Sequence, residues 1–328
     1  MSIFSFTSSI AASAQKFVRT SSPPLVIRFG AIGDMILITP LLRALAERHG
    51  RPCDVIGHSR WLPALFRHLP FVGDVQAIDS LNAPYLFEPS KQRVTRWLRE
   101  RPVGPVYVLQ ADVATLAMVR RARITPIASQ IDLPRGAGEH PVDWYQRLGK
   151  FSAPWRRDPE LMVSESEMTD CRHWLAQRGL QEAPLVLLQA GNRKTSTWRT
   201  STSDHKIWPV ECWAAIARGV LASMPDARVL LIGAPKEHLL ARDIETAVGD
   251  KRVLAVADQV PLRRLFALQR LAHSLISVDT GPAHAAAALG CPAVVLFGHT
   301  DPRAIGPING LGPCHTVHPH GAPSLTSR

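Results

Sequence analysis

The first group of residues with chemical potential is the turn Gly-Ala-Ile-Gly-Asp at 30–34. It follows a short apolar run, so we expect Asp34 at or near the start of a helix that leaves a strand. A carboxylate in a cleft can act as a general base, but aspartate also caps helices routinely, and these residues alone leave both open. Gly30 and Gly33 are small enough to let a substrate approach the backbone. The spacing is not the G-x-G-x-x-G of dinucleotide sites.

A second group is Ser-Val-Asp-Thr-Gly-Pro-Ala-His at 277–284, which runs from a predicted strand into an Ala-rich helix. Free amides at a helix N-terminus, with the helix dipole behind them, attract phosphate groups. Thr280 adds a hydroxyl, and His284 lies near the mouth of this site. The alternative is an ordinary capped helix with a satisfied histidine.

Two further segments carry single charged candidates. Lys206 begins Lys-Ile-Trp-Pro-Val-Glu-Cys-Trp and can place a point charge against a diphosphate; the alternative is a solvated lysine beside packing tryptophans. Glu237 ends Gly-Ala-Pro-Lys-Glu after a predicted strand and can accept hydrogen bonds from ribose hydroxyls. Taken alone, Glu237 is better explained as a helix start.

The sequence lacks several motifs of familiar enzyme classes. It contains no Asp-x-Asp, His-Glu-x-x-His, P-loop or Gly-x-Ser-x-Gly pattern. Metal-dependent transferases, zinc hydrolases, P-loop kinases and typical serine hydrolases therefore lack their expected machinery. We expect any chemistry to proceed without a metal or other cofactor.

The pattern of elements predicts how these groups are positioned. From residue 24 onward, short apolar runs alternate with longer amphipathic segments, as in α/β folds with a mostly parallel sheet. Two such series join near residues 152–184, which predicts two doubly wound, Rossmann-like domains facing a cleft. Ligands bind beyond the carboxyl ends of the strands in such sheets, where the candidate residues fall. We expect a flexible tail at 1–22, domains at 23–165 and 166–314, and an irregular tail at 315–328.

The expected elements can be placed by residue range. We predict strands at 25–29, 53–57, 75–78, 106–109, 185–189, 229–232, 275–278 and 293–297. We predict helices at 37–50, 141–148, 166–178, 210–224, 236–248, 262–272 and 282–289. Pro40 should kink or divide the first helix.

Composition limits the class of protein. The chain has 328 residues, of which 46% are hydrophobic and 20% charged, which excludes a disordered or fibrous protein and favours two globular domains. The five cysteines are widely spaced and match no metal motif, as in a reducing cytosol. No apolar stretch reaches the ~20 residues of a membrane span.

The charge is strongly basic and unevenly distributed. Lys and Arg number 38 against 27 Asp and Glu, a net +11, and the excess is larger in the N-terminal half. Such a surface attracts phosphates, nucleic acid or acidic lipid headgroups. Basic residues cluster at 91–101 and 120–123, although for any one cluster a solvated helix face is the favoured explanation.

Taken in order, these segments resemble glycosyltransferase family 9, the bacterial lipopolysaccharide heptosyltransferases. The resemblance extends from about residue 24 to residue 310. It rests on IRFGAIGDMILITPLLRAL, KIWPVECW, IGAPKE and above all SVDTGPAHAAAALGCPAVVLFGHTDPRAIGP at 277–307.

The resemblance implies a GT-B glycosyltransferase. Its N-terminal half would bind a lipopolysaccharide core acceptor and its C-terminal half ADP-heptose, at the cytoplasmic face of the inner membrane. Asp34 would be the base of an inverting, metal-independent transfer. On the donor side, Lys206, Thr280 and Gly281 would stabilise the diphosphate, Asp279 would bind sugar hydroxyls, Glu237 the ribose, and His284 would contact the donor site.

Other hypotheses stay open at this point. The long basic loop from 191 to 206 resembles only a subset of the family, and the residues after 307 lack the apolar period of a closing helix. The alternative is therefore a catalytically impaired nucleotide-sugar-binding protein of the same fold. A nucleic-acid-binding protein is disfavoured because the basic clusters lack interleaved aromatic residues.

Overall fold

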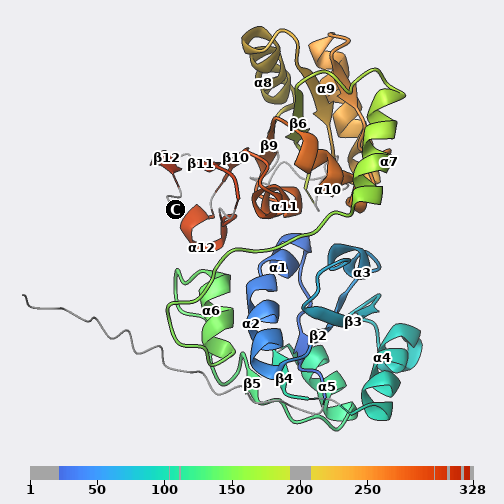
Figure 1. The fold of residues 1–328 in the computed structure, drawn as a ribbon, viewed down its shortest axis with the longest axis vertical. Helices are drawn as coiled ribbons and strands as arrows, with labels where there is room; N and C mark the ends of the chain where they lie inside the picture. Colours follow the sequence, from blue (N-terminus) through green and yellow to red (C-terminus); the bar gives the residue numbers. More distant parts are fainter. Residues whose placement is uncertain are drawn as a thin grey trace, which may run out of the picture.

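Two mostly parallel β-sheets, each covered by helices, stand one above the other in the computed structural model of the chain (Figure 1). The structure describes residues 22–102, 104–110, 112–192, 208–298, 300–308, 311–318 and, for the backbone, 321–325. The first sheet has the order β3-β2-β1-β4-β5, and the second has the order β12-β11-β10-β9-β6-β7-β8. In the described residues, no helix combines the length and the hydropathy that a membrane span requires.

The first sheet is parallel throughout, and its central strand β1 is buried on both faces. Buried parallel strands are apolar along their whole length because helices cover both sides, as the Leu-Val-Ile of β1 illustrates. Its strands are β1 (Leu25–Ile27), β2 (Cys53–His58), β3 (Val72–Ile78), β4 (Val106–Val108) and β5 (Ala128–Ser129). Its helices are α1 (Ile32–Ile36), α2 (Thr39–His49), α3 (Leu62–Leu65), η1 (Tyr85–Phe87), α4 (Pro89–Glu100), α5 (Val113–Arg121) and α6 (Pro141–Leu148).

A break between two helices does lie close to Pro40, but it precedes the proline. α1 ends at Ile36 and α2 begins at Thr39, with Pro40 in its first turn. Proline is tolerated there because the first-turn amides have no acceptor within the helix. α2 ends at Gly50, whose φ of 64° is the left-handed conformation that glycine adopts without strain.

The second sheet has one antiparallel edge strand, β12. Its strands are β6 (Leu185–Gln189), β7 (Arg228–Leu231), β8 (Val253–Ala255), β9 (Ser274–Val278), β10 (Ala293–Leu296), β11 (Cys314–His318) and β12 (Gly321–Leu325). Its helices are α7 (Glu165–Ala176), α8 (Val210–Ser223), η3 (Pro235–Glu237), α9 (His238–Val248), α10 (Leu262–Leu271), α11 (Gly281–Leu289) and α12 (Pro302–Ile305). β6 lies between β7 and β9, so the strand order reverses at β6, where doubly wound sheets bind ligands.

All the predicted strands and helices are present, with ends that differ by at most three residues. The prediction of an irregular segment from residue 315 is wrong. β11 pairs in parallel with β10, and β12 pairs with β11. In β11, Cys314 and Thr316 are buried while His315 and Val317 are not, which is the two-residue period of a strand. A search for a helical period misses that pattern.

The two sheets are joined by direct contacts as well as by the chain. α1 of the first sheet packs against α11 of the second, and α3 packs against α10. Glu167 of α7 pairs with Arg263 of α10 at 2.5 Å and with His68, which follows α3, at 3.5 Å. The Arg263 side chain holds the pKa of Glu167 at about 2. The interface is therefore anchored by an ionised carboxylate.

Candidate active site

The candidate site begins where α1 and α11 touch. A Cβ at Gly33 would lie 2.6 Å from Cδ2 of His284, and a Cβ at Gly281 would lie 2.8 Å from Cβ of Ile32. Both glycines thus allow the two helices to approach closely. The structure brings together the first two sequence groups, and the space beside Gly33 is filled by the His284 ring. A contact between substrate and the Gly33 backbone stays a prediction.

Asp34 is held from two sides. It occupies the third position of α1, where Oδ2 accepts a hydrogen bond from the Ala31 amide at 2.9 Å. Oδ1 accepts one from Nη2 of Arg28 at 3.2 Å. The side chain folds back over Gly30, where a Cβ would lie 2.5 Å from Cβ of Asp34. The Asp34 side chain is still 40% exposed, so capping does not exclude a second role for its carboxylate.

Arg28 connects Asp34 to a neighbouring strand end. Nη1 of Arg28 donates to Oε1 of Gln110 at 3.1 Å, and Nε2 of Gln110 donates to Oδ2 of Asp112 at 2.8 Å. Asp112 caps α5 through the Thr115 amide at 2.9 Å and the Thr115 hydroxyl at 2.6 Å. Asp34, Arg28, Gln110 and Asp112, which we call the Asp34 network, form one hydrogen-bonded chain along the carboxyl edge of the first sheet.

The protonation states of the groups around Asp34 follow from their surroundings. Burial lowers the pKa of Arg28, but the neighbouring Tyr145 and Asp34 outweigh it and raise that pKa. Burial raises the pKa of Tyr145 to about 12, although Arg28 opposes this. Burial acts to raise the pKa of Asp112, but hydrogen bonds from Thr115 and Gln110 lower it below its usual value. At neutral pH Arg28 is a cation, Asp112 an anion and Tyr145 neutral.

The second half of the candidate site, predicted to bind the donor, centres on the start of α11. Asp279 is buried, and its Oδ1 lies 4.0 Å from Nε2 of His284. The Thr280 hydroxyl donates to the Val278 carbonyl at 3.3 Å instead of capping α11. Pro282 has no amide hydrogen, and the Ala283 amide donates to the Thr280 carbonyl at 3.1 Å. Gly281 therefore provides the first-turn amide that α11 does not use for its own first bonds.

Glu237 lies two strands away, beyond the end of β7. Its Oε2 accepts hydrogen bonds from the Ala234 amide at 2.8 Å and from Nε2 of Gln189 at 3.1 Å. Burial raises the pKa of Glu237, while these hydrogen bonds and Lys236 oppose the rise. β6 lies between β7 and β9, and its residue Gln189 is in register with Ser277 of β9. Two strand spacings, about 10 Å, therefore separate the ends of β7 and β9.

Close packing around Glu237 depends on two glycines. A Cβ at Gly191 would lie 2.8 Å from Cδ of Glu237, and a Cβ at Gly233 would lie 2.6 Å from its Oε2. The carboxylate therefore stands against bare backbone at the ends of β6 and β7. This is the position from which a buried acid can meet a ligand at the strand edge.

Lys206 lies outside the described residues, so its predicted place against a diphosphate stays a prediction. Trp208, which follows it, is partly exposed, and its ring centroid lies 6.0 Å from that of the fully buried Trp213. Among the described residues, no group of three or more His, Cys, Asp and Glu side chains could hold a metal ion.

Sequence reasoning missed His140, which joins the two sheets. Nδ1 of His140 accepts from the Val142 amide at 3.3 Å at the start of α6, and Nε2 faces the Gly306 carbonyl beyond α12 at 3.0 Å. These two contacts require the neutral tautomer with hydrogen on Nε2. Burial lowers the pKa of His140 to about 4, against the opposing effect of Gly306.

Sequence reasoning also missed Arg28, Gln110, Asp112 and Gln189. Three of them could have been found, because Gln110, Asp112 and Gln189 end or follow predicted strands on the carboxyl edges where ligands bind. Arg28 lies inside the predicted strand 25–29, where nothing in the pattern marks it.

A family comparison bears on this arrangement. A model of glycosyltransferase family 9 (heptosyltransferase) matches residues 159–325, slightly more than half of the chain. The chain belongs to glycosyltransferase family 9. The match includes the residues around Glu237 and all of α11.

Named members of the family align with part of this family 9 chain. Lipopolysaccharide heptosyltransferase 1 of Escherichia coli (strain K12) is 34% identical over 106 residues, which cover 32% of each protein. The enzyme of the same name from Salmonella typhimurium is 29% identical over 144 residues, 44% of this chain and 41% of that one. The alignments thus span between a third and two fifths of these relatives.

Solved structures resemble nearly the whole family 9 chain. A glycosyl transferase family 9 structure from Veillonella parvula has a TM-score of 0.75 at 17% identity, covering 93% of this chain and 88% of that one. The structure of E. coli ADP-heptose lps heptosyltransferase II has a TM-score of 0.72 at 21% identity, covering 90% and 91%. The predicted fold class, two Rossmann-like domains in the GT-B arrangement, is confirmed.

Proposed function

We propose that this chain transfers a heptose from ADP-heptose to a lipopolysaccharide core acceptor, with inversion at the anomeric carbon and without a metal. The observation that carries the proposal is the contact between α1 and α11. It sets α1, the helix that carries Asp34, against the start of α11, next to Asp279, Thr280 and Gly281. One group suited to removing a proton and another suited to stabilising a diphosphate thus meet in one place.

Asp34 acts as the general base in this proposal. The acceptor hydroxyl oxygen attacks C1 of the heptose, the bond from C1 to the phosphate oxygen breaks, and the hydroxyl proton passes to Asp34. The Asp34 side chain is partly exposed and its Oδ1 is oriented by Arg28, which supports a carboxylate that can receive a proton. A positioned base of this kind contributes about 10²- to 10⁴-fold to rate.

The C-terminal domain stabilises ADP as it departs. A diphosphate leaving group needs stabilisation of its charge more than it needs a proton, and preorganised amides and cations supply this. We assign that task to the Gly281 amide, the Thr280 hydroxyl and Lys206. Pro282 at the second position of α11 supports the assignment of Gly281, because the helix offers few other amides there.

Glu237 and Asp279 bind the two sugars of the donor. About 10 Å between the ends of β7 and β9 suits a ribose at Glu237 when the diphosphate lies at α11. Asp279 and the adjacent His284 then face the heptose hydroxyls. The acceptor binds to the N-terminal domain, at residues 23–165, and the donor to the C-terminal domain, at residues 166–314. We further propose that the chain works in the cytoplasm, against the inner membrane surface that holds the acceptor.

The experiment that tests this function is ADP release from ADP-heptose by the purified chain in the presence of EDTA, with and without a heptose-deficient lipopolysaccharide core. Acceptor-dependent release supports a metal-independent heptosyltransferase. Release that needs an added divalent cation contradicts metal independence. Binding of ADP-heptose without release under any of these conditions favours a nucleotide-sugar-binding protein that has lost catalysis.

A further inference from the structure

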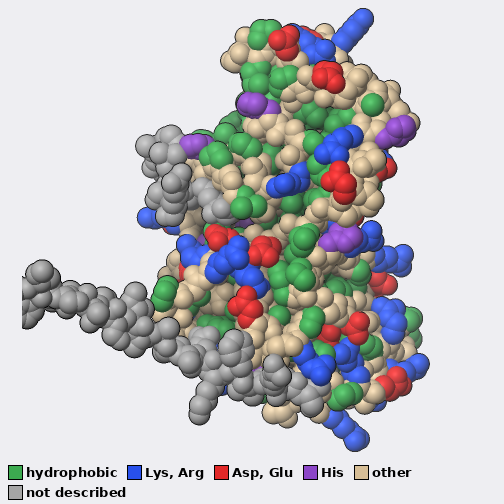
Figure 2. Space-filling model, in the orientation of Figure 1, with side chains coloured by type: hydrophobic (Ala, Val, Ile, Leu, Met, Phe, Trp, Pro, Cys, Tyr) green, Lys and Arg blue, Asp and Glu red, His purple; other side chains and the backbone are tan. Residues whose placement is uncertain are grey.

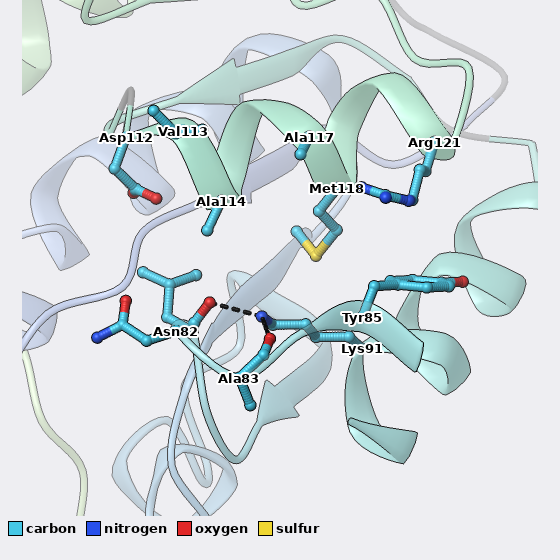
Figure 3. Close-up of a pocket in the computed structure, with 11 residues that line it drawn as sticks. Asn82, Ala83, Tyr85, Lys91, Asp112, Val113, Ala114, Ala117, Met118 and Arg121 are labelled. Carbon is cyan, nitrogen blue, oxygen red and sulfur yellow. Dashed lines mark hydrogen bonds between the residues drawn. The ribbon is translucent and has the colours of Figure 1, made fainter. Parts of the chain in front are cut away.

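A cavity of about 500 Å³ opens between the segment 81–87 and α5 in the N-terminal domain (Figure 3). Its walls are mostly apolar, from Leu81, Ala83, Ala114, Ala117 and Met118. Asp112 stands at one end, while Tyr85 and Arg121 stand at the other. The cavity therefore has apolar walls between an anionic end and a cationic end.

The segments that form this cavity carry unusually exposed apolar side chains. Val113, Phe87 and Leu86 are 83%, 80% and 79% exposed, the highest values for large hydrophobic side chains among the described residues. Val113 lines the cavity as the first residue of α5, and the other two follow Tyr85 in η1. Apolar side chains that gather around a hollow mark an interaction site.

Hydrogen bonds from α4 hold the backbone of the segment 81–87. Nζ of Lys91 donates to the carbonyls of Leu81 and Ala83, each at 2.5 Å, and the Gln92 amide donates to the carbonyls of Tyr85 and Leu86 at 3.1 and 3.0 Å. The buried Lys91 thus holds the segment and is not a solvated charge. α4 thus fixes the backbone of η1, the element that carries Leu86 and Phe87.

The elements next to these apolar side chains also carry arginines. Arg96 lies four residues after Gln92 on α4, so it shares the helix face that meets η1, and Arg120 and Arg121 end α5. The Arg121 guanidinium lies 4.9 Å from the Tyr85 ring centroid. None of the ion pairs between described residues includes Arg96, Arg120 or Arg121. Figure 2 shows Lys and Arg side chains interspersed with Asp and Glu over the N-terminal domain.

We propose that these six residues, Leu86, Phe87, Val113, Arg96, Arg120 and Arg121, form a docking surface for an anionic lipid bilayer. The apolar tips enter the boundary between headgroups and acyl chains, and the arginines contact lipid phosphates. Apolar area combined with basic charge is what binds proteins to such interfaces. The alternative, a basic helix face turned to water, leaves the three apolar tips unexplained.

The docking surface is continuous with the Asp34 network. Asp112 lines the cavity next to Val113 and is hydrogen-bonded through Gln110 to Arg28, which holds Asp34. A lipid-linked acceptor held at this surface would keep its anchor in the bilayer while its sugar reaches Asp34. This link to the acceptor rests on the proposed function, whereas binding to a bilayer does not.

The test is co-sedimentation of the full chain with vesicles of phosphatidylcholine, with and without phosphatidylglycerol. We expect the triple variant Leu86→Gln, Phe87→Gln, Val113→Thr to bind at least about tenfold more weakly than the parent chain. The matched control is Leu239→Gln with Leu311→Gln, which removes side chains that are 68% and 72% exposed in the C-terminal domain. This control should bind like the parent chain.

A second variant tests the charges separately. Arg96→Gln with Arg120→Gln should weaken binding to the anionic vesicles by about fivefold for each arginine and leave binding to neutral vesicles unchanged. Its control, Arg51→Gln with Lys251→Gln, removes two exposed cations elsewhere and should have a smaller effect. Thermal unfolding of each variant confirms that the fold is kept.

The result that overturns the docking surface is vesicle binding by the triple variant equal to that of the parent chain, or absence of binding by the parent chain itself. ADP release from a soluble core oligosaccharide, measured without vesicles, reports on the proposed function alone. Vesicle binding that depends on the surface, without ADP release, therefore overturns the function and keeps the surface. ADP release without vesicle binding that depends on the surface overturns the surface and keeps the function.

Discussion

The two sides of the candidate active site are built in different ways. On the acceptor side, Asp34 is held by side chains that come from distant parts of the chain, since Gln110 lies 82 residues from Arg28. On the donor side, the ligand positions are set mainly by backbone, with glycines at Gly191, Gly233 and Gly281 that leave no room for a Cβ. The first side is a charged network at a partly exposed carboxylate, and the second is a buried strand edge.

This difference explains which parts of the site leave a recognisable motif in the sequence. A strand edge with glycines and a helix start leaves a contiguous motif, so the sequence predicts the segments 233–237 and 277–284 as a site. A network of side chains leaves no such motif, because its members meet only after the sheet has formed. Mutations on the two sides should therefore separate catalysis from donor binding.

Apart from changes to Asp34 itself, the largest effect is expected at Arg28. In Arg28→Met the Asp34 carboxylate and the Gln110 amide oxygen lose their shared donor. We expect kcat to fall by about 10²-fold or more, while KM for ADP-heptose stays nearly constant because the donor side is intact. Arg28→Lys keeps the charge but cannot reach both partners in one plane, so it should recover only part of the rate. A large rise in KM for the donor in Arg28→Met would contradict the separation.

The next effect is expected at His140, which joins the two sheets, and it concerns the pH dependence of stability. The folded-state pKa of His140 is about 4, below the unfolded value of ~6.5. The unfolded chain therefore binds the proton first, and stability is lost as pH falls from about 6.5 toward 4, by up to about 3 kcal/mol. Protonation also places a hydrogen on Nδ1 opposite the Val142 amide.

Unfolding free energies at several pH values check this expectation. His140→Gln should flatten the pH dependence between 4 and 6.5, whereas His173→Gln, at an exposed position, should leave it in place. A pH dependence that is unchanged in His140→Gln would refute the assignment.

A smaller effect on stability is expected at the helix contact. Gly33→Ala inserts a Cβ 2.6 Å from the His284 ring, so α1 and α11 must separate. Overpacking of this kind costs about 1–3 kcal/mol, and the displacement should lower turnover as well. Gly219→Ala in α8 is the matched control, because a Cβ there meets nothing within 4 Å. Equal unfolding free energies for the two variants would mean that the contact tolerates the added methyl.

The smallest effect is expected on the donor side. Glu237→Gln removes the charge that accepts hydrogen bonds from Ala234 and Gln189. We expect ADP to bind about tenfold more weakly, with kcat nearly unchanged. Calorimetric titration with ADP measures the first quantity and steady-state kinetics the second. A drop in kcat with unchanged ADP affinity would place Glu237 on the catalytic side instead.

Much of the fold could be predicted from the sequence, for reasons visible in particular elements. Parallel strands such as β6 are apolar along their length, and α2 is bounded by Pro40 and Gly50, so both kinds of pattern are local. α4 was not predicted because charged residues obscure its apolar period, and α5 was not predicted because it is short and apolar on most sides. β11 was missed because its two-residue period is short and includes two histidines.

The candidate site could be predicted only in part. Asp34, Glu237 and the α11 segment lie at strand ends, and that position marks them. The cap and base interpretations of Asp34 looked like alternatives in the sequence, yet its two oxygens have different partners. Lys206 lies outside the described residues, so its role rests on the resemblance of its segment.

The most direct test of the central claim compares acceptor-dependent ADP release by the parent chain and by Asp34→Asn, together with the affinity of each for ADP. Asparagine keeps the shape and the oxygen that accepts from Ala31 but cannot take up the acceptor proton. We predict a fall in turnover of about 10²- to 10⁴-fold with unchanged ADP affinity. Turnover within a few fold of the parent chain would show that Asp34 is a helix cap and not the base.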